Sequence, residues 1–179
     1  RVLFRSVKLD EDNIFLWRAN SRRIEAEAVR DNLLNVSGSL DLAMGGPDID
    51  HTQGLTSKRR SIYLRIAAEK EVEFLKIFDG PAVTECYERH PSVMPQQALA
   101  LANSELAFAE AKKIAAKLTA ESADAFIRQA FERILARQPT PNELRLCGEF
   151  LSATTKPAAA ARDNLILVLL NHNDFVTVR

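Results

Sequence analysis

The sequence has few cysteines, no excess of charge of either sign and no long apolar run, and each shortage excludes a class of protein. Its 179 residues contain only two cysteines, Cys86 and Cys147, whose spacing rules out a CxxC redox pair and a CxxCH haem-attachment site. The 24 basic and 24 acidic side chains balance, so there is no excess positive charge to hold a nucleic acid or an anionic membrane surface. The longest apolar run, Leu165 to Leu170, is far shorter than the roughly 20 residues that a membrane-spanning helix needs. We therefore expect no nucleic-acid partner and no membrane span.

Motifs for metal and cofactor chemistry are also missing. The three histidines, His51, His90 and His172, include no pair at the i, i+4 spacing that places two imidazoles on one metal. His51 follows Asp48 and Asp50, but this run lacks the spacing of a calcium loop, and we interpret it as a surface loop. The sequence has no phosphate loop, dinucleotide-binding glycine fingerprint or serine elbow. We expect no metal and no cofactor in this chain.

The first six residues are unusual. The chain starts at Arg1, and residues 1–6, RVLFRS, can be read back as CGT GTG CTC TTC CGA TCT, which resembles the end of a sequencing adapter. We interpret residues 1–6 as a non-native adapter scar fused to a truncated reading frame, the alternative being a natural β-like segment over 2–4. Residues 7–179 are then expected to form a single helical domain, the C-terminal fragment of a larger protein.

Apolar residues at helical spacing cover most of the chain and predict a mainly α fold. We expect an irregular domain of five to seven helices with long loops and at most a short extended segment near 61–66. An N-cap is expected at Asn20-Ser21 and a helix end at Ser37-Gly38, and the segment 96–118 is read as one long helix or two that join near Asn103-Ser104. Residues 158–170 are apolar nearly all round from Leu165, which is typical of a buried helix.

The strongest local signal is a capping box at residues 140–143. Thr140 is at the cap, Pro141 is at the first helical position and Glu143 is three residues after the cap. The helix that follows is expected to turn Leu144, Cys147, Phe150 and Leu151 inward. Cys147 is then a core residue, and its pairing with Cys86 is left open.

The densest charged cluster lies at residues 22–31. On one continuous helix Arg23, Glu27, Arg30 and Asp31 share a side, which predicts a salt-bridged, solvated face. The functional alternative is a carboxylate pair, Glu27 and Asp31, oriented by arginines to bind a sugar or a cation or to move a proton. In a second basic patch, at residues 58–60, Arg60 beside Tyr63 is a candidate for binding an anionic group.

Several short blocks occur together in a recognisable order. They are RRIEAEAVRD at 22–31, MGGP at 44–47, RRSIYL at 59–64, FDGP at 78–81, SVMPQQALALANS at 92–104, LARQPTPNEL at 135–144 and LNHNDF at 170–175. In this order they resemble the C-terminal part of the planctomycete cytochrome-associated domain of unknown function. The chain departs from the family pattern at Gly80, where an aromatic residue is frequent, so an aromatic ligand platform at this turn is in doubt.

The resemblance implies a cellular context. Members of this family are typically exported proteins, periplasmic or at the cell surface, that often carry a c-type haem domain upstream. Their gene neighbourhoods associate them with degradation of complex or sulfated polysaccharides. The fragment itself is expected to be a structural or interaction module that packs against upstream domains of the same chain. The candidate contact and binding residues are Trp17, Arg22, Arg23, Arg60, Tyr63, Arg89, Gln97 and Asn103. The alternative is part of an enzyme on a glycan, with Glu27, Asp31 and Asp79 as acid, base or cation ligands and Arg60 and Arg89 as anion binders.

Overall fold

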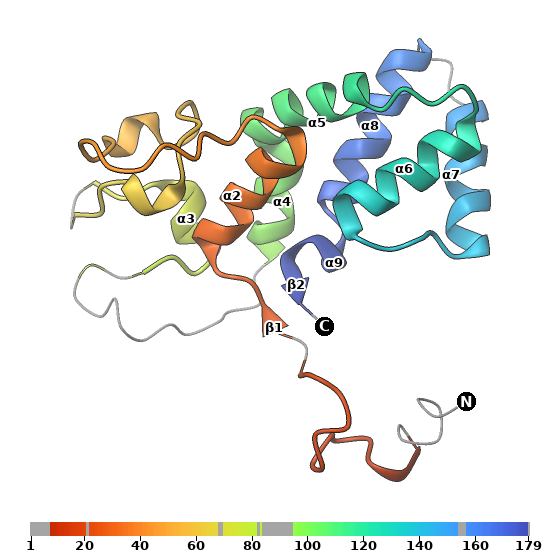
Figure 1. Cartoon of the computed structure of the whole chain (residues 1–179), viewed down its shortest axis with the longest axis horizontal. Coiled ribbons are helices and arrows are strands. Elements are labelled where there is room, and N and C mark those ends of the chain that lie inside the picture. Colours follow the sequence, from red (N-terminus) through yellow and green to blue (C-terminus); the bar gives the residue numbers. More distant parts are fainter. Residues whose placement is uncertain are drawn as a thin grey trace.

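The structure is a computed structural model that describes residues 8–20, 22–67, 70–81, 83, 95–153 and 157–178. These residues form a mainly helical domain, as predicted (Figure 1). In chain order the elements are β1 (Arg22–Arg23), α2 (Ala26–Ser37), the 3-10 turns η1 (His51–Gln53) and η2 (Ser61–Tyr63), α3 (Glu73–Ile77), α4 (Pro95–Asn103), α5 (Glu105–Lys117), α6 (Ala123–Leu135), α7 (Pro141–Ala153), α8 (Ala158–Leu170), α9 (Asn173–Val176) and β2 (Thr177–Val178). Residues 1–6, interpreted above as an adapter scar, lie outside the described part of the chain.

The hydrophobic core lies where α2, α5, α6 and α8 meet, and the most extensive helix contact is between α5 and α8. Leu33 of α2, Ile114 of α5, Phe126 of α6 and Ile166 of α8 are all 0% exposed. Each such side chain stabilises the fold by about 1.5–3 kcal/mol relative to leaving it in water. The burial predicted for α8 is confirmed, although Val168 remains 61% exposed.

Helix α7 lies at the edge of the domain. It contacts α6 and α8, and none of its residues is fully buried. Leu144, Cys147 and Leu151 pack half-buried against the core, as predicted. The inward placement of Phe150 is wrong, because this side chain is 40% exposed. Because α7 has neighbours on one side only, its buried stripe is too narrow to include all four residues that were expected to face inward.

The caps predicted near Ser104 and at Thr140 are confirmed in atomic detail. Ser104 separates α4 from α5, and its hydroxyl accepts from Ala107 N–H at 3.4 Å. The Thr140 hydroxyl accepts from Glu143 N–H at 3.3 Å, while the Glu143 carboxylate accepts from Thr140 N–H at 2.7 Å. This reciprocal pair satisfies two backbone donors that a helix start leaves without partners.

The start of α2 differs from the prediction. An N-cap at Asn20-Ser21 is wrong, because Glu25 occupies the cap position and the helix begins at Ala26, whereas Ser21 lies outside the described residues. The preceding residues form β1, which pairs antiparallel with β2, and Ile24 N–H donates to Val176 O at 2.9 Å. The end of the chain therefore lies against the start of α2 (Figure 1). The predicted helix end is confirmed by Gly38, which has the left-handed φ of 69°.

The apolar alternation at 61–66 does not form a strand. Ser61–Tyr63 form a 3-10 turn, and Leu64 makes an isolated parallel bridge with Ile49. Ile62 is 72% exposed whereas Leu64 is 6% exposed, because the turn rotates the two side chains to different sides. The segment between α2 and α3 is thus a folded loop that lies along α2.

Candidate functional site

Arg30 holds the loop after α2 against the helix. Its side chain is 0% exposed, Nε donates to Gly54 O at 2.7 Å, and Nη1 donates to Arg59 O at 3.0 Å. Nη1 also donates to Ser61 Oγ at 3.1 Å, and Nη2 donates to Ser57 O. Burial lowers the pKa of Arg30, and the Coulombic attraction of Asp31 partly opposes this shift. The expected solvated face is therefore wrong for Arg30, whose guanidinium is the polar centre of a buried loop attachment.

Asp31 extends the same attachment. Its Oδ1 accepts from both the backbone N–H and the hydroxyl of Ser61, each at 2.7 Å. Its Oδ2 is 3.6 Å from Arg60 Nε, and Oδ1 is 3.6 Å from Arg30 Nη1. Asp31 therefore fixes the start of η2 and places the exposed Arg60 beside α2.

Arg59 organises the second turn of the loop. Its guanidinium lies over the Tyr63 ring, 3.9 Å from the centroid, and donates to Pro47 O at 3.2 Å and to Gly45 O. The Tyr63 hydroxyl accepts from Gly45 N–H at 2.9 Å. Tyr63 thus stacks with Arg59, not with Arg60, and both side chains hold the glycine turn at 44–47 in place.

A second set of predicted residues forms a separate chain of contacts. Arg23 Nη1 donates to Gln97 Oε1, and Gln97 Nε2 donates to Asp79 Oδ2 at 3.2 Å. Gln97 is 3% exposed, so these contacts link β1, α4 and the end of α3. A Cβ atom at Gly80 would lie 2.7 Å from Leu75 O, so the turn needs glycine at this position. Arg23 is not on the helix face where the sequence predicted it.

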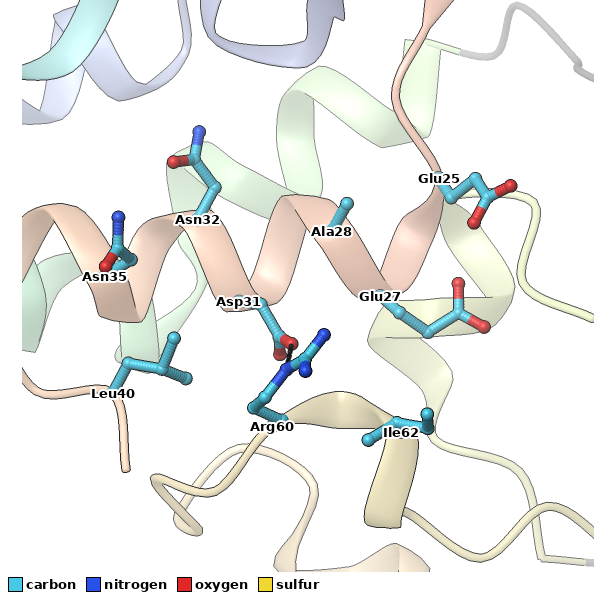
Figure 2. Close-up of a pocket in the computed structure, with 9 residues that line it drawn as sticks. All are labelled: Glu25, Glu27, Ala28, Asp31, Asn32, Asn35, Leu40, Arg60 and Ile62. Carbon is cyan, nitrogen blue, oxygen red and sulfur yellow. Dashed lines mark ion pairs between the residues drawn. The ribbon is translucent and has the colours of Figure 1, made fainter. Parts of the chain in front are cut away.

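A groove of about 550 Å³ runs beside α2 (Figure 2). The lining residues are Glu25, Glu27, Ala28, Asp31, Asn32, Asn35, Leu40, Arg60 and Ile62. Two of the three predicted carboxylates, Glu27 and Asp31, share this groove one helical turn apart, whereas Asp79 does not line it. The Asp31 carboxylate already accepts two hydrogen bonds from Ser61, and Figure 2 shows Arg60 pointing toward it.

A second hollow of about 520 Å³ lies on the other side of the same helix. Asn32 and Asn35 line both hollows and therefore lie between them. The far side of the second hollow is formed by the end of α6 and by α9 and β2, including Arg133 and Asp174. We refer to these two hollows, with Asn32 and Asn35 between them, as the α2 trough.

The family of the chain follows from a comparison of its sequence. The model of the PSD1 family, described as a protein of unknown function (DUF1553), matches residues 4–151. The chain belongs to this family. No curated protein and no solved structure matched the chain.

Of the remaining predicted residues, those that the structure describes do not line the trough. Trp17 Nε1 donates to Asp10 O at 2.9 Å within the turn at 10–18, and Arg22 pairs with Val178 in the small sheet. Asn103 is exposed at the end of α4, while Arg89 lies outside the described residues.

The described residues of the DUF1553 domain offer neither a metal-ligand cluster nor a membrane-spanning helix. In them no group of three or more His, Cys, Asp or Glu side chains is placed to hold a metal ion. Asp48 pairs with Arg65, and Asp50 accepts from Thr52 N–H at 3.0 Å, which agrees with a surface loop. No helix in this part of the chain combines the length and apolarity that a bilayer span requires.

Three residues that define the site are not apparent from the sequence. The charge pattern predicts a solvated face for Arg30, and no motif singles out Asn32 or Asn35. Leu33 and Leu34 of α2 are both buried and face the core. With these two facing the core, Asn32 and Asn35 flank the apolar stripe, which was the available signal for residues on an outer groove.

Proposed function

We propose that this DUF1553 domain is a structural and interaction module that receives another part of its own protein in the trough along α2. The observation that supports this function is that the charged residues of the motifs form hydrogen bonds within the domain. Arg30, Asp31 and Arg59 are committed to internal hydrogen bonds that hold the 41–66 loop against α2. This loop supplies Arg60 and Ile62 as one wall of the groove. The motif thus builds a surface, which is the role expected of a docking module.

The exposed Ile62 supports docking. At 72% exposure it is a large apolar side chain in the lining of the groove that also contains Leu40. A partner that covers such a residue gains the free energy of removing apolar surface from water, at about 25 cal/mol per Å².

The family resemblance supplies the context of this proposal. We propose an exported protein, periplasmic or at the cell surface, in which a c-type haem domain precedes this module. The haem would be held by that upstream domain, since this chain has no CxxCH motif.

The alternative function is part of an enzyme that acts on a complex or sulfated polysaccharide. It is favoured by one observation, which is that Glu27 and Asp31 line the same groove. Against it, Asp31 accepts two hydrogen bonds from Ser61, and Asp79 is bonded to Gln97 away from the groove. The variant Glu27→Gln separates the two functions, because an enzyme would lose turnover by orders of magnitude whereas a docking module would keep its fold with a small change in stability.

The deciding experiment starts from the source DNA. The genomic sequence upstream of the codon for Val7 is recovered by long-read sequencing, and the continuous reading frame is expressed beside the 179-residue chain. Hydroxyl-radical footprinting then compares Ile62 with Val168, a matched exposed residue on α8 outside the trough. Protection of Ile62 alone in the longer protein supports docking, and equal labelling in both proteins overturns it. A start codon immediately upstream of Val7, with no haem-attachment motif, overturns the exported haem-linked context.

A further inference from the structure

Helix α9 is a single turn between the buried helix α8 and the strand β2, and a histidine caps its start. His172 occupies the N-cap position, and its Nδ1 accepts a hydrogen bond from the Asp174 backbone N–H at 3.0 Å. The Phe175 N–H donates to His172 O at 2.9 Å, and the side chains of Phe175 and Val176 are buried. The cap therefore fixes the start of a turn that belongs to the core of the domain.

The other end of this turn joins the C-terminal segment to the start of α2. Val176 is the last residue of α9, and its carbonyl accepts from the Ile24 N–H at 2.9 Å. Thr177 and Val178 then form β2, which pairs with β1 ahead of α2 (Figure 1). A change at the His172 cap is therefore separated from the β1–β2 pair by only one helical turn.

The cap requires an unprotonated Nδ1. An imidazole nitrogen accepts a hydrogen bond only through its lone pair, so His172 carries its proton on Nε2 when it caps α9. A proton taken up from solvent at Nδ1 turns this acceptor into a donor, which then faces the donating Asp174 N–H. Two donors form no hydrogen bond with each other, so protonation abolishes the cap. The side chain of His172 is 38% exposed, which gives solvent protons access to the ring.

The charged groups around the cap offer the protonated ring a different acceptor. Helix α9 packs against α6 and β2, and β2 has no charged residue. Asp174 Oδ2 lies 3.5 Å from His172 Nδ1 and accepts from Arg137 Nε at 2.8 Å. Arg137, which follows α6, also donates to Glu143 Oε1 at 2.7 Å, whereas Arg133 of α6 donates to a carbonyl of α2. A protonated His172 is therefore attracted to the Asp174 carboxylate, which it shares with Arg137, and away from the backbone amide.

We propose that His172 is a pH-sensitive latch, which caps α9 and holds β2 against β1 when neutral and releases both when protonated. Histidine is the side chain that ordinarily changes its charge between pH 5 and pH 8, so the latch responds to mild acid. Because α9 and β2 form one side of the second hollow, its release also loosens that wall. The inference stands apart from docking in the trough, since it concerns hydrogen bonds within the domain.

The test follows the intact 179-residue chain in ¹H–¹⁵N NMR spectra between pH 8 and pH 5. The Asp174 amide signal should shift with the same midpoint as the ring C–H signals of His172. Protection of the Ile24 N–H against hydrogen exchange, corrected for the intrinsic rate at each pH, should fall about fivefold from pH 7.5 to pH 5.5, as expected for the loss of one N-cap. The matched control is the Asp41 N–H, which donates to Lys58 O at 2.8 Å in the 41–66 loop and should keep its protection.

Three variants assign the effect to one side chain. His172→Asn supplies an N-cap acceptor that does not titrate, so protection of Ile24 should no longer depend on pH. His172→Ala removes the cap at every pH and should show the low protection of the acidic wild type throughout. His51→Asn is the matched control, because His51 lies in η1 of the 41–66 loop, and it should keep the pH dependence of the wild type.

Each contrary result overturns the inference. An Asp174 amide signal that stays in place while His172 titrates would show that the cap survives protonation. Equal protection of Ile24 at both pH values would show that β2 is not coupled to the cap. A pH dependence that persists in His172→Asn, or that disappears in His51→Asn, would place the titrating group elsewhere. An equal loss of protection at Asp41 would show a general effect of acid on the chain and no specific release of β2.

Discussion

Replacing Arg30 by methionine tests whether this arginine holds the loop after α2 in place. Methionine has a similar length and keeps the apolar part of the side chain, so the change removes mainly the guanidinium. Four acceptors then lose their donor, namely the carbonyls of Gly54, Ser57 and Arg59 and the hydroxyl of Ser61. The loop is expected to detach locally from the helix.

The magnitude follows from two opposing contributions. Each buried acceptor left without a donor costs about 1–3 kcal/mol. Methionine also removes the desolvation cost of a buried cation, which is several kcal/mol. Because three backbone carbonyls and the Ser61 hydroxyl lose their donor unless the loop separates from the helix, we expect a net loss of about 3–5 kcal/mol in the free energy of unfolding, the range seen when one partner of a buried charged network is deleted.

Urea unfolding followed by far-UV circular dichroism measures this loss. For a domain of this size an m value of about 2 kcal/mol/M turns the expected change into a shift of about 2 M in the midpoint. Arg30→Lys keeps the charge but not the planar fork of donors, and should lose about half as much. The matched control is Arg145→Met on α7, an exposed arginine that pairs with Glu149, with an expected loss below about 0.5 kcal/mol. An Arg30→Met protein within 1 kcal/mol of wild type would refute the assigned role.

Three further predictions concern helix ends. Hydrogen bonding to Arg137, ahead of other causes, lowers the pKa of Glu143 to about 2 from 4.5, so this carboxylate stabilises the fold above pH 4.5 and loses that contribution as the pH falls toward 2. Glu143→Gln should therefore lower the free energy of unfolding by about 1–2 kcal/mol at pH 7 after solvent screening. Unfolding curves of the variant and the wild type that differ equally at pH 7 and pH 2 would contradict this. Gly38→Ala should cost about 1–2 kcal/mol, since φ is 69° and the new Cβ would meet Lys117 Nζ at 2.6 Å; a thermal midpoint equal to wild type would count against it. Ser122→Ala removes the hydroxyl that accepts from Ala125 N–H and should cost about 1 kcal/mol in urea unfolding, with Ser122→Asp restoring most of the loss.

The features that the sequence predicted correctly depend on neighbours along the chain. Ser104 and the Thr140–Glu143 pair act on amides within three residues of themselves, so their chemistry can be read without a fold. The buried character of α8 is equally local, because an apolar surface all round one helix has to be covered by something. These signals gave the helical class and most helix boundaries.

The errors at Arg30 and at the start of α2 arise because the deciding partners are distant in sequence. Nothing within one turn of Arg30 distinguishes an arginine in a surface salt-bridge ladder from one that is buried. The difference lies in the carbonyls of Gly54 and Ser57, which are more than 20 positions away and are hidden in the sequence because every residue has a carbonyl.

The trough was hidden in the sequence for the same reason, because its two walls come from segments that are distant along the chain. Asn32 and Asn35 are ordinary polar residues on a helix until the 41–66 loop forms one wall beside them and α9 and β2 form the other. The loop wall depends on Arg30, and the other wall depends on the pairing of β1 with β2. A residue whose internal bonds create a surface is thus a poor guide to which residues of that surface meet the ligand. In this domain the charged motif marks the scaffold, and the exposed Ile62 that this scaffold presents is the residue to test for docking.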